Sequence, residues 1–280
     1  MKRLVFFASA LALTGCTATI KESRFIAQDD EKTLYSDTFI NTLNAQTPRH
    51  NVNVISIPSE DKTTTLYGVF LDNEKTQNTV LYIPGNGMSV EKAATNALLE
   101  LAEYDYDIVI FDRRGLGASE GTATIANLIS DANVTFDYTK QSLKADKVIV
   151  HGYSLGSFIA AQLAKNKAVD GLVMQGSATN VDDWVDEAMP WYSKVFVDVQ
   201  IDDAFYSVDN KQVLSENYVG PLLVIGGADD KQTPAILSEK LFNASTSAEK
   251  QLVIAENAGH GEMFKSKNVQ VAYQTFLAKF

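Results

Sequence analysis

The chain has 280 residues, 45% of them hydrophobic, and a formal net charge of −11 that results from 24 lysine and arginine residues against 35 acidic residues. This length and composition suit one large domain with a sizeable core, and they argue against an intrinsically disordered chain. The sequence contains no basic cluster that could follow a phosphate backbone, so we expect no nucleic-acid partner.

The first sixteen residues, MKRLVFFASALALTGC, predict a secretion signal. Lys2 and Arg3 precede the uncharged run 4–13. This run is too short for a membrane-spanning helix, which needs about 20 apolar residues. The ending LTGC resembles the bacterial lipobox. The resemblance implies that residues 1–15 are a lipoprotein signal peptide and that Cys16 becomes the diacylglycerol-modified N-terminus.

Lipid chains on Cys16 would hold the protein at a membrane surface without a transmembrane helix. Cys16 is the only cysteine, so its lipidation leaves no thiol for a disulfide or a metal site. In lipoproteins of this type an aspartate after the cysteine favours the inner membrane, whereas here Thr17 follows it. The resemblance therefore implies an outer-membrane location facing the periplasm. The alternative is a buried apolar N-terminal helix that contains a cysteine by chance.

Residues 16–47 are polar and mixed, and we expect them to form a tether with one short amphipathic helix and little functional content. A single domain is expected over residues 48–280. There, apolar and β-branched runs alternate with helix-length segments. The runs predict eight strands, at residues 52–58, 64–72, 79–85, 107–112, 147–153, 171–177, 221–227 and 251–257.

The later runs are almost continuously apolar, which is typical of strands that helices cover on both faces. The runs 52–58 and 64–72 have no helix between them, so they predict an antiparallel pair at one edge. The sequence thus predicts an α/β fold with a mostly parallel eight-stranded sheet flanked by helices.

About forty residues separate the strand at 171–177 from the strand at 221–227, which is too long for a simple crossover. This interval predicts a helical cap inserted at about 178–220. Its aromatic side chains could line an apolar pocket, but aromatics of an insert more often pack it onto the domain below. We expect packing for most of this set, which comprises Trp184, Trp191, Tyr192, Phe196, Phe205 and Tyr206.

The pattern G-x-S-x-G occurs twice, around Ser119 and around Ser154. A nucleophile elbow requires a strand, a sharp turn that carries the serine, and a helix directly after it. Only Ser154 meets all three conditions, with Gly152 and Gly156 giving room where strand and helix nearly touch. Ser119 lies in a glycine-rich loop, seven residues beyond the expected strand end at Asp112. The alternative for Ser154 is a small residue that fills a turn.

From about residue 50 onward, this arrangement resembles the α/β-hydrolase fold, and within it the serine aminopeptidase and lysophospholipase-like hydrolases. The segment FDRRGLGASEG looks like the loop after the fourth strand of such enzymes. The resemblance therefore implies an architectural role for Ser119. It also implies a triad in the chain order serine, acid, histidine.

The chain offers three histidines as the base that activates the serine. His50 precedes the sheet. His151 lies in the strand three residues before Ser154, where β geometry makes the required contact hard to form. His260 follows the last strand and alone satisfies the family order. We expect His260 to be the base.

The acid should follow the penultimate strand, where it can orient the imidazole. The stretch VIGGADDKQTP offers Asp229 and Asp230 there. The spacing to glycine and proline in similar enzymes maps onto Asp230, which we select. Asp202 and Asp203 in the cap are weaker alternatives.

An oxyanion forms when the serine attacks a carbonyl group, and backbone N–H groups must point at it. One donor should be Leu155, directly after the nucleophile. The resemblance names Asn86 as the second donor, with Gly87 as the alternative. Many relatives carry histidine-glycine where this chain has proline-glycine, at 84–85. The sequence shows no His/Cys ligand cluster and no phosphate-binding glycine pattern, so neither a metal nor a cofactor is expected.

These residues predict a serine hydrolase that cleaves a carboxylic ester of a small-molecule substrate through an acyl-enzyme on Ser154. Peptide or amide cleavage, and acyl transfer to an acceptor other than water, would use the same intermediate and stay open. A different class of function is a non-catalytic envelope lipoprotein that uses the fold as a binding scaffold.

Overall fold

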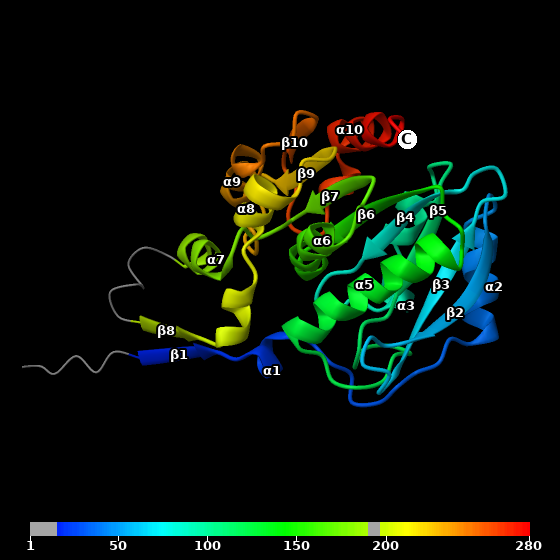
Figure 1. The fold of residues 1–280 in the computed structure, drawn as a ribbon, viewed down its shortest axis with the longest axis horizontal. Coiled ribbons are helices and arrows are strands. Elements are labelled where there is room, and N and C mark those ends of the chain that lie inside the picture. The colour runs from blue at the N-terminus through cyan, green and yellow to red at the C-terminus, as the bar shows by residue number, and fades with distance from the viewer. Residues whose placement is uncertain (1–15, 190–196) are drawn as a thin grey trace, which may run out of the picture.

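A computed structural model describes residues 16–189 and 197–280. Within these residues eight strands form one sheet, in the order β10-β9-β7-β6-β4-β5-β3-β2 (Figure 1). All eight strands predicted from the sequence are present, and their ends agree to within two residues. The strands are β2 Asn51–Pro58, β3 Thr65–Asp72, β4 Asn78–Ile83, β5 Asp107–Phe111, β6 Lys147–Tyr153, β7 Gly171–Gln175, β9 Leu222–Gly227 and β10 Lys250–Ala255.

The sheet is parallel from β5 through β4, β6, β7 and β9 to β10. Strand β2 pairs antiparallel with β3, and β3 pairs antiparallel with β5. The predicted antiparallel pair at one edge is therefore confirmed. Because the parallel strands share one direction, the loops after β4, β6, β9 and β10 all leave the same edge of the sheet.

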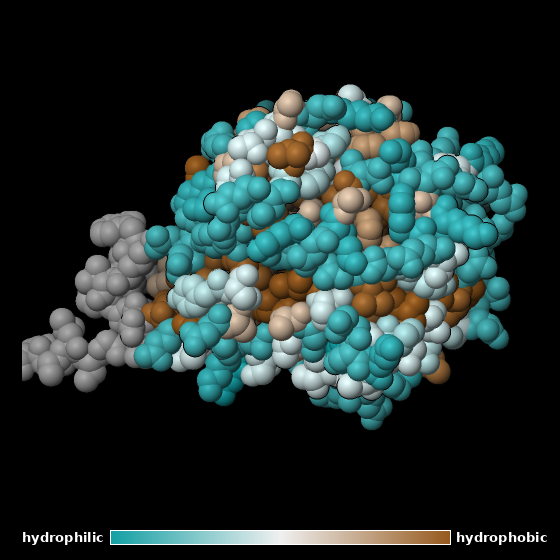
Figure 2. All heavy atoms as spheres, in the orientation of Figure 1, coloured by the Kyte–Doolittle hydropathy of each residue, from teal (hydrophilic) through white to brown (hydrophobic). Residues whose placement is uncertain are grey.

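Helices cover both faces of the sheet, as the continuously apolar strands require. In β6, Val148 and Val150 pack into one core, whereas Ile149 packs into the core on the opposite face. The first face is covered by α5 Ile125–Gln141, α6 Leu155–Asn166 and α9 Ala235–Ala244. The second face is covered by α2 Asp37–Gln46, α3 Val90–Ala93, α4 Ala97–Leu101 and α10 Lys267–Leu277. The face drawn in Figure 2 is largely hydrophilic, with hydrophobic side chains visible in a band across its middle.

In its described part, the cap between β7 and β9 contains short helices and one strand. It comprises α7 Val181–Ala188, β8 Val197–Ile201, the 3-10 turn Asp203–Ser207, α8 Asn210–Gln212 and the π-helical turn Val213–Asn217. Strand β8 pairs in parallel with β1, Cys16–Ile20, so that a small second sheet lies beside the main one (Figure 1). The prediction of a purely helical cap was therefore incomplete. Trp191, Tyr192 and Phe196 lie outside the described residues, as does the expected signal peptide at 1–15.

The segment 16–47 differs most from expectation, because it is folded onto the domain rather than free of it. The predicted amphipathic helix exists as α2, which Ser36 caps by accepting a hydrogen bond from the Phe39 N–H. Leu43 of α2 is 1% exposed, and Ile26, which follows α1 Glu22–Phe25, is 2% exposed. The expectation of little functional content stays a prediction, but this segment reaches the candidate site described next.

Candidate active site

Ser154 stands at a sharp turn between β6 and α6, with φ 54° and ψ −122°. A non-glycine residue with positive φ is strained, and here the strain turns the serine side chain away from both elements. A Cβ atom on Gly152 would overlap the Ser157 backbone, and one on Gly156 would overlap the Ile83 carbonyl. Strand and helix therefore approach each other only because both positions are glycine. The strand, turn and helix expected around Ser154 are all present.

The structure brings Ser154, His260 and Asp230 together in one hydrogen-bonded row. Ser154 Oγ lies 2.8 Å from His260 Nε2, and His260 Nδ1 lies 2.7 Å from Asp230 Oδ2. Asp230 belongs to the loop after β9, and His260 to the loop after β10. Asp230 and Ser154 are 30 and 106 residues away from His260 in the sequence. They meet its imidazole because the loops that carry them leave the same edge of the sheet.

Asp230 is held in place by its own loop. Its Oδ1 accepts hydrogen bonds from the backbone N–H groups of Gln232 and Thr233, and its Oδ2 accepts one from the Thr233 hydroxyl. Burial by itself would raise the pKa of Asp230, but the hydrogen bonds from His260 and Thr233 outweigh it and hold that pKa below its usual value. The carboxylate is therefore ionised and fixed beside the imidazole.

Tyr153 is a site residue that sequence reasoning missed. Its hydroxyl donates to the His260 carbonyl oxygen at 3.2 Å, and its ring lies 5.1 Å from the imidazole ring. Burial, followed by the charge of Asp230, raises the pKa of Tyr153 to about 12, so the phenol stays protonated as a donor. Its position just before the nucleophile was the only sequence signal for this role.

The other histidines lie away from Ser154. His151 is buried, and its ring nitrogens contact Gln175 Oε1 at 3.0 Å and the Tyr273 hydroxyl at 3.2 Å. Burial lowers the pKa of His151 to about 4. His50 is also buried, and its Nε2 contacts the Tyr106 carbonyl oxygen at 2.9 Å. Both side chains stabilise the fold rather than face the serine.

The competing carboxylates do not reach the imidazole either. Asp229 is exposed, next to Asp230. Asp202 accepts a hydrogen bond from the Ala204 N–H at the start of the 3-10 turn Asp203–Ser207, which includes Asp203. The choice of Asp230 over all three agrees with this geometry.

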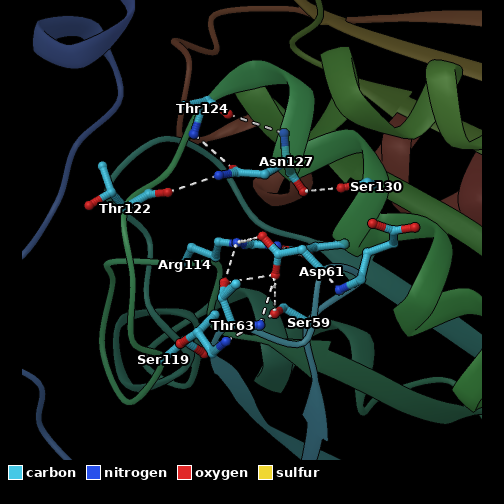
Figure 3. A network of polar contacts seen from close by, with 12 residues as sticks. Ser59, Asp61, Thr63, Arg114, Ser119, Thr122, Thr124, Asn127 and Ser130 are labelled. Atoms are coloured by element: carbon cyan, nitrogen blue, oxygen red, sulfur yellow. Dashed lines mark hydrogen bonds and ion pairs between the residues drawn. The ribbon is translucent and has the colours of Figure 1, made fainter.

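Ser119, the serine of the second G-x-S-x-G match, is buried and holds a loop to the sheet. Its hydroxyl donates to the Asp112 carbonyl oxygen at 2.6 Å and accepts from the Tyr67 N–H at 2.8 Å. In the same loop Arg114 forms a buried ion pair with Asp131 of α5. Figure 3 shows Arg114 beside Asp61, its second ion-pair partner. These contacts agree with the architectural role that the resemblance implies for Ser119.

The expected oxyanion donors flank Ser154. Leu155 is the first residue of α6, and Asn86 lies in the loop after β4. The N–H groups of Leu155, Asn86 and Gly87 donate no hydrogen bond to another described residue, so either loop residue can serve beside Leu155 as an oxyanion donor. Gly87, the alternative donor, has φ 72° and lies on the same loop.

Two spaces meet at Ser154. The first is an apolar cavity of about 250 Å³ between the cap and α6. Phe25 packs edge to face against both Trp184 and Phe205 there, with ring centroids 5.5 and 5.3 Å apart. These aromatics therefore pack the cap and line the pocket at once. The cavity is lined by Phe25, Asn86, Ser154, Leu155, Phe158, Ala178, Asn180, Val181, Trp184, Phe205, Lys231, Gln232 and Thr233.

The second space is an open groove of about 390 Å³ that Ser154 also lines. Its wall is more polar, with Lys92, Thr95 and Asn96 on it. Lys92 Nζ donates to the Gly87 carbonyl oxygen at 2.9 Å, and no described carboxylate lies within 4.0 Å of it. The site thus joins an apolar cavity to a polar groove that carries a cation.

No helix of the described residues is both long and apolar enough to cross a membrane. No group of three or more His, Cys, Asp or Glu side chains in residues 16–189 and 197–280 is arranged to hold a metal ion.

Comparison with known proteins agrees with this architecture. The family described as alpha/beta hydrolase fold matches residues 78–205, and the family described as TAP-like protein matches residues 202–279. Protein ABHD12B of Homo sapiens is 26% identical in an alignment of 220 residues, which covers 69% of this chain and 59% of that protein once gaps are left out. Lysophosphatidylserine lipase ABHD12 of Danio rerio is 26% identical in an alignment of 180 residues, which covers 59% of this chain and 46% of that protein. The chain thus spans about half the length of these curated relatives.

Among solved structures, the Pyrococcus furiosus esterase Pf2001 superposes with a TM-score of 0.70 over 91% of this chain and 97% of that chain, at 15% identity. At this identity the likeness concerns the fold alone.

Proposed function

The chain is a hydrolase of the α/β-hydrolase family, and from this premise we propose that it cleaves a carboxylic ester through an acyl-enzyme on Ser154. The observation that carries the proposal is the row of contacts from Ser154 Oγ through His260 to Asp230, at 2.8 and 2.7 Å. A nucleophile, a base and an orienting carboxylate in this geometry are what acyl transfer to a serine requires.

In the proposed reaction, Ser154 Oγ attacks the ester carbonyl carbon while His260 Nε2 takes the hydroxyl proton. The N–H groups of Leu155 and Asn86 stabilise the oxyanion, and Asp230 stabilises the imidazolium. The ester C–O bond then breaks, and His260 protonates the departing alcohol. Water adds to the acyl-enzyme with His260 again as the base, and the acid leaves as Ser154 regains its proton.

The shape of the site favours an amphiphilic ester. The apolar cavity suits the acyl chain, and the more polar groove, which also reaches Ser154, suits the alcohol part. The charged residues that line the two spaces, His260 aside, are Lys231 in the cavity and Lys92 in the groove, so a polar neutral or anionic alcohol is favoured. The similarity to a lysophosphatidylserine lipase supports the same class of substrate.

The lining also favours an ester over an aminoacyl amide. An aminopeptidase needs an anionic group to bind the substrate ammonium. No Asp or Glu is found among the described residues that line the cavity or the groove. Hydrolysis of a panel of esters with increasing chain length, compared with aminoacyl amides, tests this choice, and faster turnover of the amides would reverse it.

Labelling with a fluorophosphonate probe tests the nucleophile. We expect the wild type to be labelled, Ser154→Ala to be unlabelled, and His260→Ala to be labelled far more slowly. The matched control is Ser119→Ala, in the second G-x-S-x-G match, which should still be labelled. Labelling that is lost only in Ser119→Ala would overturn the choice of Ser154 as the nucleophile. A folded wild type that is not labelled would overturn the enzymatic function and favour the binding scaffold.

We further propose that Cys16 carries the lipid anchor, on the strength of the LTGC sequence alone. The protein would then be attached to the outer membrane and face the periplasm. Metabolic labelling with an alkynyl fatty acid tests this proposal. Incorporation into the wild type but not into Cys16→Ser is expected, and equal incorporation into both would contradict it.

A further inference from the structure

The side chain of Asn86 forms a junction between the candidate oxyanion loop and the N-terminal segment. Its Nδ2 donates to the Phe25 carbonyl oxygen at 2.7 Å, and its Oδ1 accepts from the Ala27 N–H at 2.8 Å. One side-chain amide thus pairs with the backbone on both sides of Ile26, which is buried in the core. An exposed asparagine with three defined hydrogen bonds is fixed rather than free.

Arg113 ties the same junction to the sheet. From its place after β5, its guanidinium donates to the carbonyl oxygens of Gly85 at 3.0 Å and Ala27 at 2.8 Å, and to Asn86 Oδ1 at 2.9 Å. No carboxylate of the described residues lies within 4.0 Å of Arg113. Its planar fork therefore acts as a brace between three backbone segments, rather than as half of an ion pair.

The N-terminal segment is in turn fastened to the loop that carries Arg113. The Asp29 N–H donates to the Gly115 carbonyl oxygen at 2.8 Å, and Asp29 Oδ2 accepts from the Gly117 N–H at 2.7 Å. The loop 113–121, which contains the second G-x-S-x-G match, thus serves as a platform for this segment. Within the platform, Ser119 holds the loop to β3. Segment, platform and oxyanion loop form one connected unit.

We propose that Arg113 and the Asn86 side chain are positioning residues, which hold the backbone N–H of residue 86 at the oxyanion through the N-terminal segment. This inference rests on the proposed function. Oxyanion donors act only when they are fixed before the charge develops. A loop that is free to move by about 1 Å would lose a large part of that effect, while most of the cavity wall, which α6 and the cap supply, stays in place to bind the substrate. The signature is a loss in kcat at nearly constant KM.

Neighbouring arginines provide a matched test. In Arg113→Gln we expect kcat on the preferred ester to fall by about 10- to 100-fold, with KM changed by less than about threefold. Arg113→Lys keeps part of the donor set, so its kcat should lie between those of the wild type and Arg113→Gln. Arg114→Gln removes an equally central arginine whose partners are Asp131 and Asp61, far from the oxyanion loop in the hydrogen-bond network. It should lower Tm yet leave kcat within about threefold.

A double variant tests whether the two residues act through the same loop. Asn86→Ala removes the side-chain junction but keeps the backbone N–H, and should lower kcat like Arg113→Gln. If both act on one donor, the loss in the double variant is no greater than about that of the worse single variant. Losses that multiply would overturn the proposal.

Two further outcomes separate this inference from the proposed function. If the wild type is not labelled by fluorophosphonate, the proposed function fails first. If the wild type is labelled but Arg113→Gln keeps its kcat, or if kcat falls equally in Arg113→Gln and Arg114→Gln in step with Tm, the positioning role fails alone.

Discussion

The Tyr153 hydroxyl donates to the carbonyl oxygen of His260, at 3.2 Å, while its ring lies against the imidazole. The residue before the candidate nucleophile therefore holds the loop that presents the candidate base. Strand β6 supplies one end of this contact and the loop after β10 the other, so the two parts of the site are tied together directly.

Tyr153→Phe removes this hydrogen bond and keeps the ring. A neutral hydrogen bond contributes about 1 kcal/mol, which corresponds to about a fivefold loss in kcat if it is used to hold His260. Tyr153→Ala, which also removes the ring contact, should lose more. Steady-state kinetics on one ester checks whether kcat falls in the order wild type, Tyr153→Phe, Tyr153→Ala. An unchanged kcat in Tyr153→Ala would show that the contact with Tyr153 does not help to position His260.

Asp230→Asn should lower kcat by roughly a thousandfold or more, because the amide no longer stabilises the imidazolium and can favour the wrong tautomer. Asp229→Asn, one residue earlier and exposed, is the matched control and should stay within about twofold of the wild type. Equal losses in the two variants would contradict the choice of Asp230.

Ala178→Phe should shorten the accepted acyl chain. Ala178 lines the apolar cavity of about 250 Å³, and a phenyl ring there would occupy a large part of the volume. We expect kcat/KM for long-chain esters to fall by about tenfold or more while an acetate ester changes by less than about threefold. A uniform fall across chain lengths would mean that the cavity does not hold the acyl group.

Lys92→Gln should discriminate between alcohol parts of the substrate. The ammonium lies in the groove and has no described carboxylate partner, so it can attract a negative charge on the leaving alcohol. For an ester with an anionic alcohol we expect kcat/KM to fall by about three- to tenfold, an effect that added salt weakens. Neutral esters, and the variant Lys144→Gln far from the groove, should show no such change.

His151 should make stability depend on pH. Its folded pKa is about 4, against an ordinary value of 6.5, because burial disfavours the charged form. The unfolded chain therefore binds a proton between these values and the folded protein does not, so its contribution to stability is present above pH 6.5 and is lost as pH falls toward 4. The full effect is on the order of 3 kcal/mol.

Thermal unfolding of the wild type and His151→Gln between pH 7 and 4 measures this contribution. The difference in Tm between the two proteins should shrink as pH falls. The difference is the relevant quantity, because Asp107, whose pKa burial raises to about 7, titrates in the same range with the opposite sign. A difference that stays constant would mean that folding leaves the pKa of His151 unchanged.

Much of the fold was predictable from the sequence because parallel strands covered on both faces are continuously apolar, and such runs are conspicuous. The glycines beside Ser154 could be interpreted as part of a nucleophile elbow, because the close approach of strand and helix there leaves no room for a Cβ atom. Asp230 and His260 followed from chain order, since the loops after β9 and β10 must leave the same edge as Ser154.

The N-terminal contribution could not be predicted, and the reason is physical. Phe25 and Ala27 bind Asn86 through backbone atoms, which every residue type possesses. The pairing of β1 with β8 likewise consists of backbone hydrogen bonds between segments about 180 residues apart. Contacts of this kind leave no side-chain pattern, whereas a buried glycine or an apolar strand does.

The fastening of residues 25–29 to the platform has a practical consequence for protein production. The family match begins only at residue 78 and the main sheet at β2, so an expression clone that starts just before α2 would keep both and discard this segment. The Asn86 amide would lose both backbone partners and Arg113 one of its three, while apolar surface now covered by Ile26 would face water. Such a shortened protein could fold around an intact Ser154 and still be a poor catalyst, and its weak activity would wrongly count against the enzyme.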